Sequence, residues 1–250
     1  GKTLSLVLQD KVPFSLDFLP GIENIVSLAD YAKQPDVIVL LDCNSLSRAG
    51  DEKLKKLAQQ AQIVNIDHHA TGNANETLDN AIRMVDPEAS ATGELIYEYL
   101  QLLQVWEELP KELQQILALV LFSSIAADTG MFRFNNTKSK TFHYAGDLLA
   151  YGVDIETVRI HLFENKTKMQ LLMQGVALDK LKTAAEGKLA YIIITQEDIA
   201  SVGATEEDCS NLVVNTMLLD GVKIGIIFEE KSDGLVKISL RSRNGYNVGK

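Results

Sequence analysis

Three polar residues, Asp67, His68 and His69, directly follow the apolar run Ile63–Ile66. A buried strand holds the residues at its carboxyl end rigidly, and open α/β sheets place their sites at that edge. Carboxylates and imidazoles bind divalent metals, and a histidine also acts as an acid or a base. Successive side chains of an extended chain point opposite ways, so we expect one histidine to reach a metal while the other faces a substrate. The alternative is that Asp67 caps the next segment and both histidines bond to the backbone.

Two further aspartates stand at the ends of apolar segments. Asp42 comes directly after Val37–Leu41, so neighbouring strands would deliver Asp42 and Asp67 to one edge of a sheet, although a capping role is the alternative. Asp128 ends a long apolar helix, where the helix dipole is also negative. Cation binding would offset that placement, and a solvated Asp-Thr-Gly turn explains the sequence equally well.

A basic candidate site lies near the end of the chain. Val222–Phe228 and Leu235–Leu240 predict a hairpin whose second strand carries Ser239 and Arg241 close to its end. Because arginine binds phosphate through two parallel hydrogen bonds, this strand end is a candidate anion clamp. A solvated basic strand end is the alternative.

The segments that must position these groups alternate between strand and helix patterns. Apolar runs predict strands at Leu4–Leu8, Val37–Leu41 and Ile63–Ile66, and the last two enclose a helical pattern at Asp51–Gln60. Continuous valine, isoleucine and leucine runs are typical of a parallel sheet covered on both faces. The sequence therefore predicts an α/β fold with a parallel sheet that has helices on both faces.

The later segments predict a helical middle and then a second, smaller α/β domain. Helical spacing of apolar residues and capping signals predict helices over Gly93–Leu103, Pro110–Asp128, Thr137–Leu149 and Ile155–Phe163, with a short strand at Met131–Phe134. After Asn165 we expect a long connector helix at Lys168–Ala185, a strand at Lys188–Thr195, a helix at Glu206–Leu219 and the hairpin described above.

Composition excludes some classes of partner. The 250 residues are 46% hydrophobic and carry a formal net charge of −10, which argues against a duplex DNA-binding surface. Two cysteines, Cys43 and Cys209, stand far apart and indicate a reduced, cytoplasmic compartment. The longest apolar run, Ile116–Ala127, is too short to cross a bilayer, so we expect no membrane partner.

Five motifs in order give the chain a specific resemblance. They are Asp42–Arg48, Ile66–His69, Asp86–Thr92, Ala127–Phe134 and Lys237–Ser242. Over nearly its whole length the chain resembles the DHH phosphoesterases, in the DHH/DHHA1 branch that includes bacterial oligoribonucleases (nanoRNases) and phosphatases of 3′-phosphoadenosine 5′-phosphate. The resemblance implies a DHH catalytic domain over residues 1–165, a connector helix over 166–186 and a DHHA1 substrate-binding domain over 187–250.

The resemblance also implies a two-metal site. Asp42 would bridge the two ions, and His68 and Asp128 would be further ligands. Carboxylates with imidazole and no thiolate favour Mn²⁺ over structural zinc, with Mg²⁺ or another divalent ion as alternatives.

The same site has candidate catalytic and substrate-binding residues. His69, with Asp67, would lie beside the substrate phosphate as the catalytic residues. Arg133, Arg241 and Ser239 would bind the substrate.

The expected activity is metal-dependent hydrolysis of short RNA or DNA oligonucleotides or of 3′,5′-bisphosphate nucleotides. The alternatives are cleavage of cyclic or linear dinucleotides and, from another class, a non-catalytic nucleotide-binding module; a homodimer is an open alternative to a monomer. Two family motifs, a His-x-x-Pro-Asp-x-Asp strand and a Gly-Gly-Gly-His loop, have no counterpart. We expect them just beyond the two ends of the chain, and expect these residues alone to bind metal weakly and hydrolyse nothing.

Overall fold

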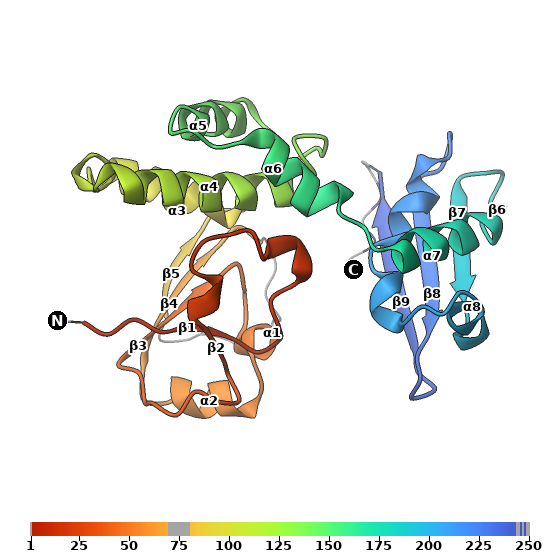
Figure 1. The fold of residues 1–250 in the computed structure, drawn as a ribbon, viewed down its shortest axis with the longest axis horizontal. Coiled ribbons are helices and arrows are strands. Elements are labelled where there is room, and N and C mark those ends of the chain that lie inside the picture. Colours follow the sequence, from red (N-terminus) through yellow and green to blue (C-terminus); the bar gives the residue numbers. More distant parts are fainter. Residues whose placement is uncertain (1, 70–80, 244–245, 247, 249–250) are drawn as a thin grey trace. The chain divides into compact units, whose positions relative to one another are not determined.

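The computed structural model describes residues 2–69, 81–243, 246 and 248. The chain divides into two compact units, unit 1 (Gly1–Asn165) and unit 2 (Lys166–Lys250). In Figure 1, unit 1 runs from red to green and unit 2 from blue-green to blue.

Unit 1 contains two parallel sheets. Strands β1 (Leu6–Leu8) and β2 (Ile25–Ser27) pair with each other, and β3 (Val37–Leu41), β4 (Gln62–Asp67) and β5 (Ile82–Val85) form a sheet in the order β3-β4-β5. The predicted α/β class with a parallel sheet is confirmed. The sequence pattern does not predict β5, because Arg83 interrupts the apolar residues of this four-residue strand.

The connection from β3 to β4 aligns the ends of these two strands. It contains α1 (Leu46–Ala49) and α2 (Glu52–Ala58), and Leu54 of α2 packs with Leu40 and Leu28 in a small hydrophobic cluster. The opposite face of β3 is less covered in the described part of the chain, where Val37, Val39 and Leu41 remain half exposed.

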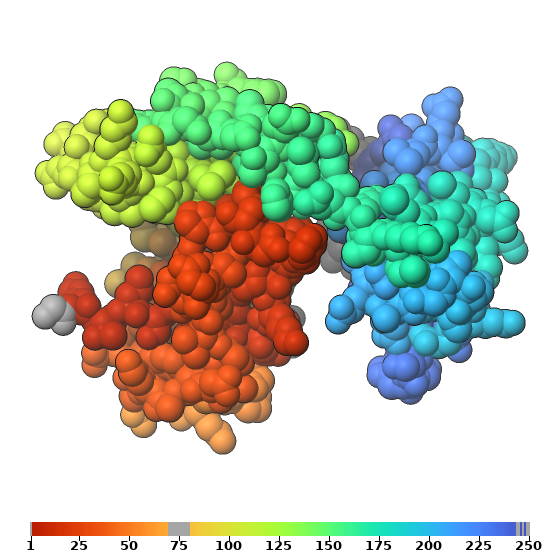
Figure 2. Space-filling model, viewed as in Figure 1, coloured from red at the N-terminus to blue at the C-terminus, as the bar shows by residue number. Residues whose placement is uncertain are grey.

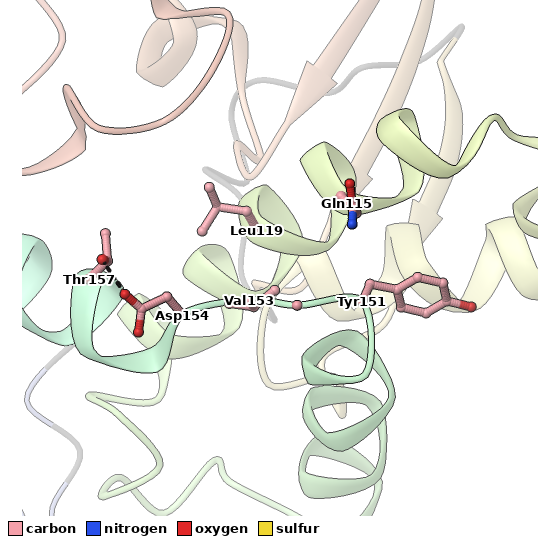
Figure 3. A pocket seen from close by; sticks show the side chains of 7 residues that line it. Gln115, Leu119, Tyr151, Val153, Asp154 and Thr157 are labelled. Atoms are coloured by element: carbon pink, nitrogen blue, oxygen red, sulfur yellow. Dashed lines mark hydrogen bonds between the residues drawn. The ribbon is translucent and has the colours of Figure 1, made fainter.

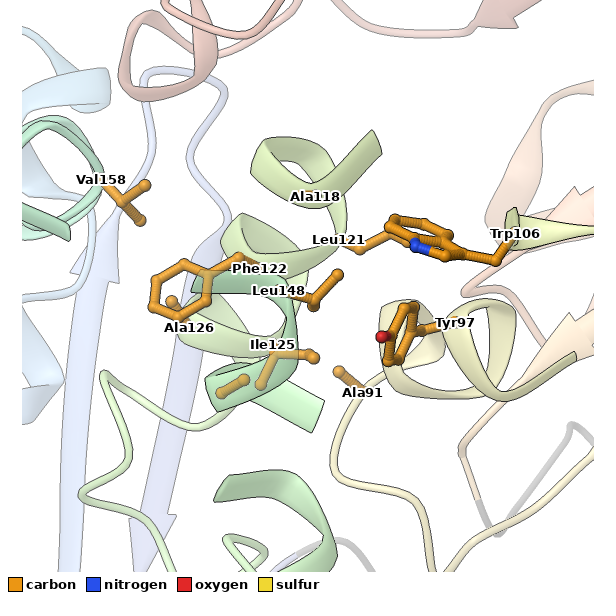
Figure 4. Packing of buried hydrophobic residues seen from close by; sticks show 11 residues of the cluster. Ala91, Tyr97, Trp106, Ala118, Leu121, Phe122, Ile125, Ala126, Leu148 and Val158 are labelled. Carbon is orange, nitrogen blue, oxygen red and sulfur yellow. The ribbon is translucent and has the colours of Figure 1, made fainter. Parts of the chain in front are cut away.

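The larger core of unit 1 is helical. Helices α3 (Thr92–Leu102), α4 (Lys111–Asp128) and α5 (Ser139–Leu149) form a layer beside the red and orange strand region (Figures 1 and 2). Trp106 and Tyr97 pack edge to face with ring centroids 4.9 Å apart, and both are buried (Figure 4). The buried residues of this core are Ala91, Tyr97, Trp106, Ala118, Leu121, Phe122, Ile125, Ala126, Ala145, Leu148 and Val158.

Short helical turns complete unit 1. The 3₁₀ turns η1 to η3 span Phe14–Leu16, Ile22–Asn24 and Trp106–Glu108. The helix predicted over Ile155–Phe163 is divided: α6 (Ile155–Arg159) continues as a π-helical turn, η4 (Ile160–Glu164).

The strand predicted at Met131–Phe134 is wrong, because this segment is a turn. Gly130, Met131 and Phe132 have φ angles of +56°, +57° and +63°. Three successive residues in the left-handed region reverse the chain, which an extended strand cannot do.

Unit 2 is built on one mixed sheet in the order β6-β7-β8-β9. Its strands are β6 (Lys182–Ala184), β7 (Leu189–Ile194), β8 (Ile224–Glu230) and β9 (Val236–Ser242). Its helical segments are α7 (Lys168–Asp179), α8 (Gln196–Ser201), η5 (Glu206–Cys209) and η6 (Leu212–Leu218). The predicted hairpin is present as the antiparallel pair β8-β9.

Two helix predictions in unit 2 need correction. The connector helix predicted over Lys168–Ala185 ends at Asp179 because β6 follows it and pairs with β7; Met173 and Ala177 of α7 are buried in the core of unit 2. The helix predicted over Glu206–Leu219 is two 3₁₀ segments, since Asn211 between them has a φ angle of +60°.

Within the described residues, none of the helices combines the length and apolar composition that crossing a bilayer requires.

Candidate metal centre

Two neighbouring parallel strands bring the first candidate residues together. Asp42 directly follows β3, and Asp67 is the last residue of β4. The backbone N–H of Asp42 donates to the carbonyl of Ile66 at 3.0 Å, so the strand ends remain in register up to the site. Parallel strands of this kind place their carboxyl ends at one edge of the sheet.

His68 lies between two carboxylates. Its Nε2 is 3.4 Å from Oδ1 of Asp42 and 3.6 Å from Oδ2 of Asp128. Its Nδ1 lies 3.4 Å from the carbonyl oxygen of Ala89, and the buried Nε2 has no hydrogen-bond partner. Donation from Nδ1 to a carbonyl leaves the lone pair of Nε2 free for a metal, which is the usual arrangement of a ligating histidine.

Asp42 is held in an unusual conformation. Its φ angle is +58°, and its Oδ1 accepts a hydrogen bond from Thr92 at 2.8 Å. The close polar contact between the two side chains lowers the pKa of Asp42 below its ordinary value and raises the pKa of His68. Asp42 is therefore charged at neutral pH and directed towards His68.

Asp128 completes this side of the cluster from the end of α4. Burial raises its pKa to about 6, and the charge of Asp42 adds to the shift. A carboxylate in this position is unfavourable without a cation, because the helix dipole and Asp42 both repel its negative charge. The contact with His68 places Asp128 in the cluster, which the sequence alone left undecided.

His69 is oriented by Asp67. The fully buried Asp67 accepts through Oδ1 from the backbone N–H of His69 at 3.1 Å and pairs with its ring Nδ1 at 2.7 Å. The rings of His68 and His69 lie with centroids 4.5 Å apart, so the expectation that they point opposite ways is not met. Both residues follow the end of β4, and the Asp67 carboxylate turns His69 back towards Asp42.

The donor set fits a divalent metal ion. Ligand atoms of Asp42, His68 and His69 all lie within 4.8 Å of one another, and Asp128 adds a second carboxylate next to His68. Oxygen and imidazole donors without a thiolate suit Mn²⁺ and related ions. The partnerless Nε2 of His68 is the strongest sign that a ligand belongs here.

Sequence reasoning missed two residues that support these groups. Thr92 donates to Asp42, and the fully buried Asn65 donates from Nδ2 to the carbonyl of Cys43 at 2.8 Å. Asn65 stands in the middle of an apolar strand. Because a buried amide there needs a hydrogen-bond partner, its position in the strand could have indicated a supporting role for Asn65.

The three predicted substrate-binding residues lie in different places. Arg133 donates from Nε to the carbonyl of Gly130 at 2.6 Å, in the turn that follows Asp128, and its guanidinium lies 5.7 Å from the ring centroid of Phe163. Ser239 and Arg241 share one face of β9 in unit 2, as alternate residues of a strand do. The structure therefore places Arg133 in unit 1, in the turn that follows Asp128, and the other two residues in unit 2.

A pocket elsewhere in unit 1 has no comparable chemistry (Figure 3). It lies beside α4 and is lined by Gln115, Leu119, Tyr151, Gly152, Val153, Asp154 and Thr157. The carboxylate of Asp154 is engaged as the cap of α6, accepting from Thr157 at 2.6 Å and from the backbone of Glu156 at 3.0 Å. The acidic side chain in the lining of this pocket, Asp154, is therefore already occupied in capping α6.

The turn after Asp128 gives a test of how the cluster is positioned. A Cβ atom at Gly130 would lie 2.5 Å from the Phe134 ring, and its φ angle is left-handed. We expect Gly130→Ala to lower the free energy of unfolding by about 2–4 kcal/mol. Gly146→Ala, in α5 with open space at Cβ, should instead raise it by about 0.5–1 kcal/mol. Urea unfolding of both variants measures the difference, and equal effects would contradict this account.

The raised pKa of Asp128 predicts a pH-dependent stability. A carboxyl whose pKa rises from 3.8 to about 6 on folding favours the folded state at low pH, and that contribution is lost as the pH rises through about 6. Asp128→Asn should therefore raise the melting temperature of the metal-free protein more at pH 8 than at pH 4.5. A shift of this size corresponds to at most about 3 kcal/mol, and the 32% exposure of the side chain reduces it. Equal melting-temperature changes at both pH values, with chelator present, would refute the prediction.

Comparisons with known proteins agree with this geometry. The description "DHH family, N-terminal domain" matches residues 3–125. The bifunctional oligoribonuclease and PAP phosphatase NrnA of Bacillus subtilis (strain 168) is 26% identical over 230 residues, covering 92% of this chain and 68% of that protein. The cyclic-di-AMP phosphodiesterase GdpP of Geobacillus thermodenitrificans is 29% identical over 216 residues, covering 85% of this chain and 30% of that protein.

A solved structure shares the fold. The exopolyphosphatase-related protein from Bacteroides fragilis superimposes with a TM-score of 0.85 at 23% identity, over 96% of this chain and 70% of that one. The family match covers the strands and helices that carry Asp42, Asp67, His68 and His69. Residues 3–125 therefore match the N-terminal domain of the DHH family, which is the part of the chain that carries these four residues.

Proposed function

We propose that this chain belongs to a metal-dependent phosphoesterase that hydrolyses short oligonucleotides or 3′,5′-bisphosphate nucleotides. The observation that carries the proposal is the convergence of Asp42, His68 and Asp128 around a partnerless imidazole nitrogen. The named activity of the Bacillus subtilis relative supports the substrate class.

Each residue of the site has a proposed task. Asp42, His68 and Asp128 would hold divalent ions, with Mn²⁺ as the best fit to their oxygen and nitrogen donors. Two such ions would supply positive charge to a phosphate ester and activate water near neutral pH. His69 would face the phosphate, and Asp67 keeps its ring in place.

Arginine side chains would supply the remaining phosphate contacts. Arg133 lies close to Asp128 along the chain and at the same turn, while Ser239 and Arg241 are exposed or partly exposed on β9. A guanidinium binds a phosphate more strongly than a neutral donor does, because its hydrogen bonds are charge-assisted and can be paired.

Both cysteines are free, which supports a reducing, cytoplasmic setting.

A cyclic-dinucleotide phosphodiesterase is the second candidate. It is favoured by the likeness to GdpP, which matches 85% of this chain. The same metal cluster could serve either class of substrate, because all of these compounds contain a phosphate ester: a diester in short oligonucleotides and cyclic dinucleotides, and monoesters in the bisphosphate nucleotides. Substrate preference therefore has to be measured.

A substrate series tests the proposal in the protein that carries this chain. We expect the rate of metal-dependent hydrolysis to fall steeply as the substrate lengthens from two to about twenty-four nucleotides. The longest substrates exceed the ~4–16-nucleotide sites of open strand-binding grooves. The reason is the net charge of −10, which offers a long polyanion no basic track. A 3′,5′-bisphosphate nucleotide and a cyclic dinucleotide complete the panel. An undiminished rate on the longest strand would reject the short-substrate proposal, and a clear preference for the cyclic compound would favour the second candidate.

The same series includes Arg241→Ala. Loss of one charge-assisted contact should lower kcat/KM for a dinucleotide about tenfold, mainly through KM, and should affect a simple aryl phosphate less. Lys237→Ala is the matched control, because it removes a cation from the same face of β9. The Nζ atom of Lys237 lies 3.8 Å from the carboxylate of Glu229 on the neighbouring strand. Equal losses in both variants would show that general charge, and not Arg241 itself, is responsible.

A further inference from the structure

The last carbonyl of helix α4 is satisfied by a side chain. The last carbonyls of a helix have no partner within it and must be satisfied by other groups. The three carbonyls before Asp128 accept from backbone N–H groups of Thr129–Met131. The carbonyl of Asp128 itself accepts from Nδ2 of Asn136 at 3.1 Å. Asn136 thus caps the helix at the residue whose side chain faces His68.

The same amide makes a second bond across the site. Nδ2 of Asn136 also donates to the carbonyl of Ser90 at 3.0 Å. Ser90 follows Ala89, whose carbonyl oxygen lies 3.4 Å from Nδ1 of His68. An amide nitrogen carries two N–H groups, so both find an acceptor in this arrangement. One side chain therefore connects the backbone of Asp128 to the segment that supports His68.

The far side of this segment is also fixed. The hydroxyl groups of Ser90 and Thr141 donate to the buried carboxylate of Glu94, Thr141 at 3.0 Å. The segment cannot move away from α3 without breaking these bonds. Asn136 then sets the position of the end of α4 relative to the backbone of Ala89 and Ser90. That position determines the 3.6 Å separation of His68 Nε2 and Asp128 Oδ2.

We propose that Asn136 is a positioning residue of the metal centre, which fixes the spacing of His68 and Asp128 by holding the backbone beside each. The inference rests on the metal site of the proposed function. Asn136 touches neither ligand side chain, so it acts through backbone geometry. Partners of this kind, one step removed from the metal, typically change metal affinity 10–100-fold when removed.

The test is Mn²⁺ binding to the protein that carries this chain, measured by calorimetry without substrate. Asn136→Asp keeps the shape but turns a carboxylate oxygen towards two carbonyl oxygens, and Asn136→Ala removes both donors. We expect each variant to bind Mn²⁺ about 10–100-fold more weakly than the unmodified chain. Hydrogen exchange in the metal-free protein should also be faster in residues 86–91 and 125–134 of both variants.

Asn215→Ala is the matched control. Asn215 is a buried asparagine of unit 2 that donates to the carbonyl of Leu212 at 3.1 Å, so its loss should lower the melting temperature without changing Mn²⁺ affinity. Unchanged affinity in both Asn136 variants would overturn the proposal. If the unmodified protein that carries this chain binds no Mn²⁺, the metal site of the proposed function fails. Unchanged hydrogen exchange in the two segments would then overturn the positioning role separately.

Discussion

In the protein that carries this chain, Asp42→Asn should abolish metal-dependent hydrolysis, with a fall in kcat/KM on the order of 10³-fold or more, while the protein remains folded. Metal ions at such sites supply several kcal/mol of charge stabilisation, and each 1.4 kcal/mol is a factor of ten in rate. Asp42 lies 3.4 Å from His68 and would hold metal together with it. An amide is a much weaker metal ligand than a carboxylate, so metal affinity would fall.

Asparagine is the right replacement because of the backbone. Asp42 has a φ angle of +58°, a region that asparagine tolerates better than most residues. The amide oxygen can also still accept from Thr92. A larger residue or a β-branched one would add strain and confuse loss of a ligand with loss of fold.

Hydrolysis of a dinucleotide in Mn²⁺ measures the effect, and calorimetric titration of Mn²⁺ measures the loss of binding. Asp51→Asn is the matched control, because Asp51 caps α2 through Lys53 and asparagine caps a helix equally well. Unchanged kinetics of Asp42→Asn in Mn²⁺ would remove Asp42 from the metal site.

The fold was predictable where one local pattern decided the outcome. Val37–Leu41 is a continuous, valine- and isoleucine-rich run too short for a typical helix, which favours a strand, and β3 has those bounds. Met131–Phe134 alternates in polarity like a strand, but Met131 and Phe132 lie in a left-handed turn that is fixed by hydrogen bonds to Thr129 and α4. β5 is too short to give a pattern and exists because β4 offers it a pairing edge.

The site was predictable in the same sense. Asp42 and His68 could be brought together from sequence, because parallel strands end at a common edge. The contributions of Thr92 and Asn136 could not, since each depends on a tertiary contact across 46 residues or more of chain. The mutual orientation of His68 and His69 also depends on where β4 ends, which sequence patterns locate only approximately.

A second large effect is expected for Asp67→Asn, which should lower kcat about 10–100-fold without lowering stability. The buried carboxylate of Asp67 pairs with Nδ1 of His69 at 2.7 Å and so fixes which ring nitrogen faces the site. Removing the charge from such a carboxylate–histidine pair typically costs one to two orders of magnitude. Oδ2 of Asp67 has no hydrogen-bond partner, so neutralising this buried group should leave the free energy of unfolding equal or higher.

A double-mutant cycle separates this role from direct catalysis by Asp67. If Asp67 acts through His69, then Asp67→Asn should add little to the loss already caused by His69→Asn, because both changes disrupt the same Asp67–His69 pair. Single-turnover rates of the two single variants and the double variant on a dinucleotide measure the coupling, and urea unfolding measures stability. Independent, multiplicative losses would mean that Asp67 contacts the reaction by itself. A marked loss of stability in Asp67→Asn would mean instead that its buried charge serves mainly to hold the end of β4 in place.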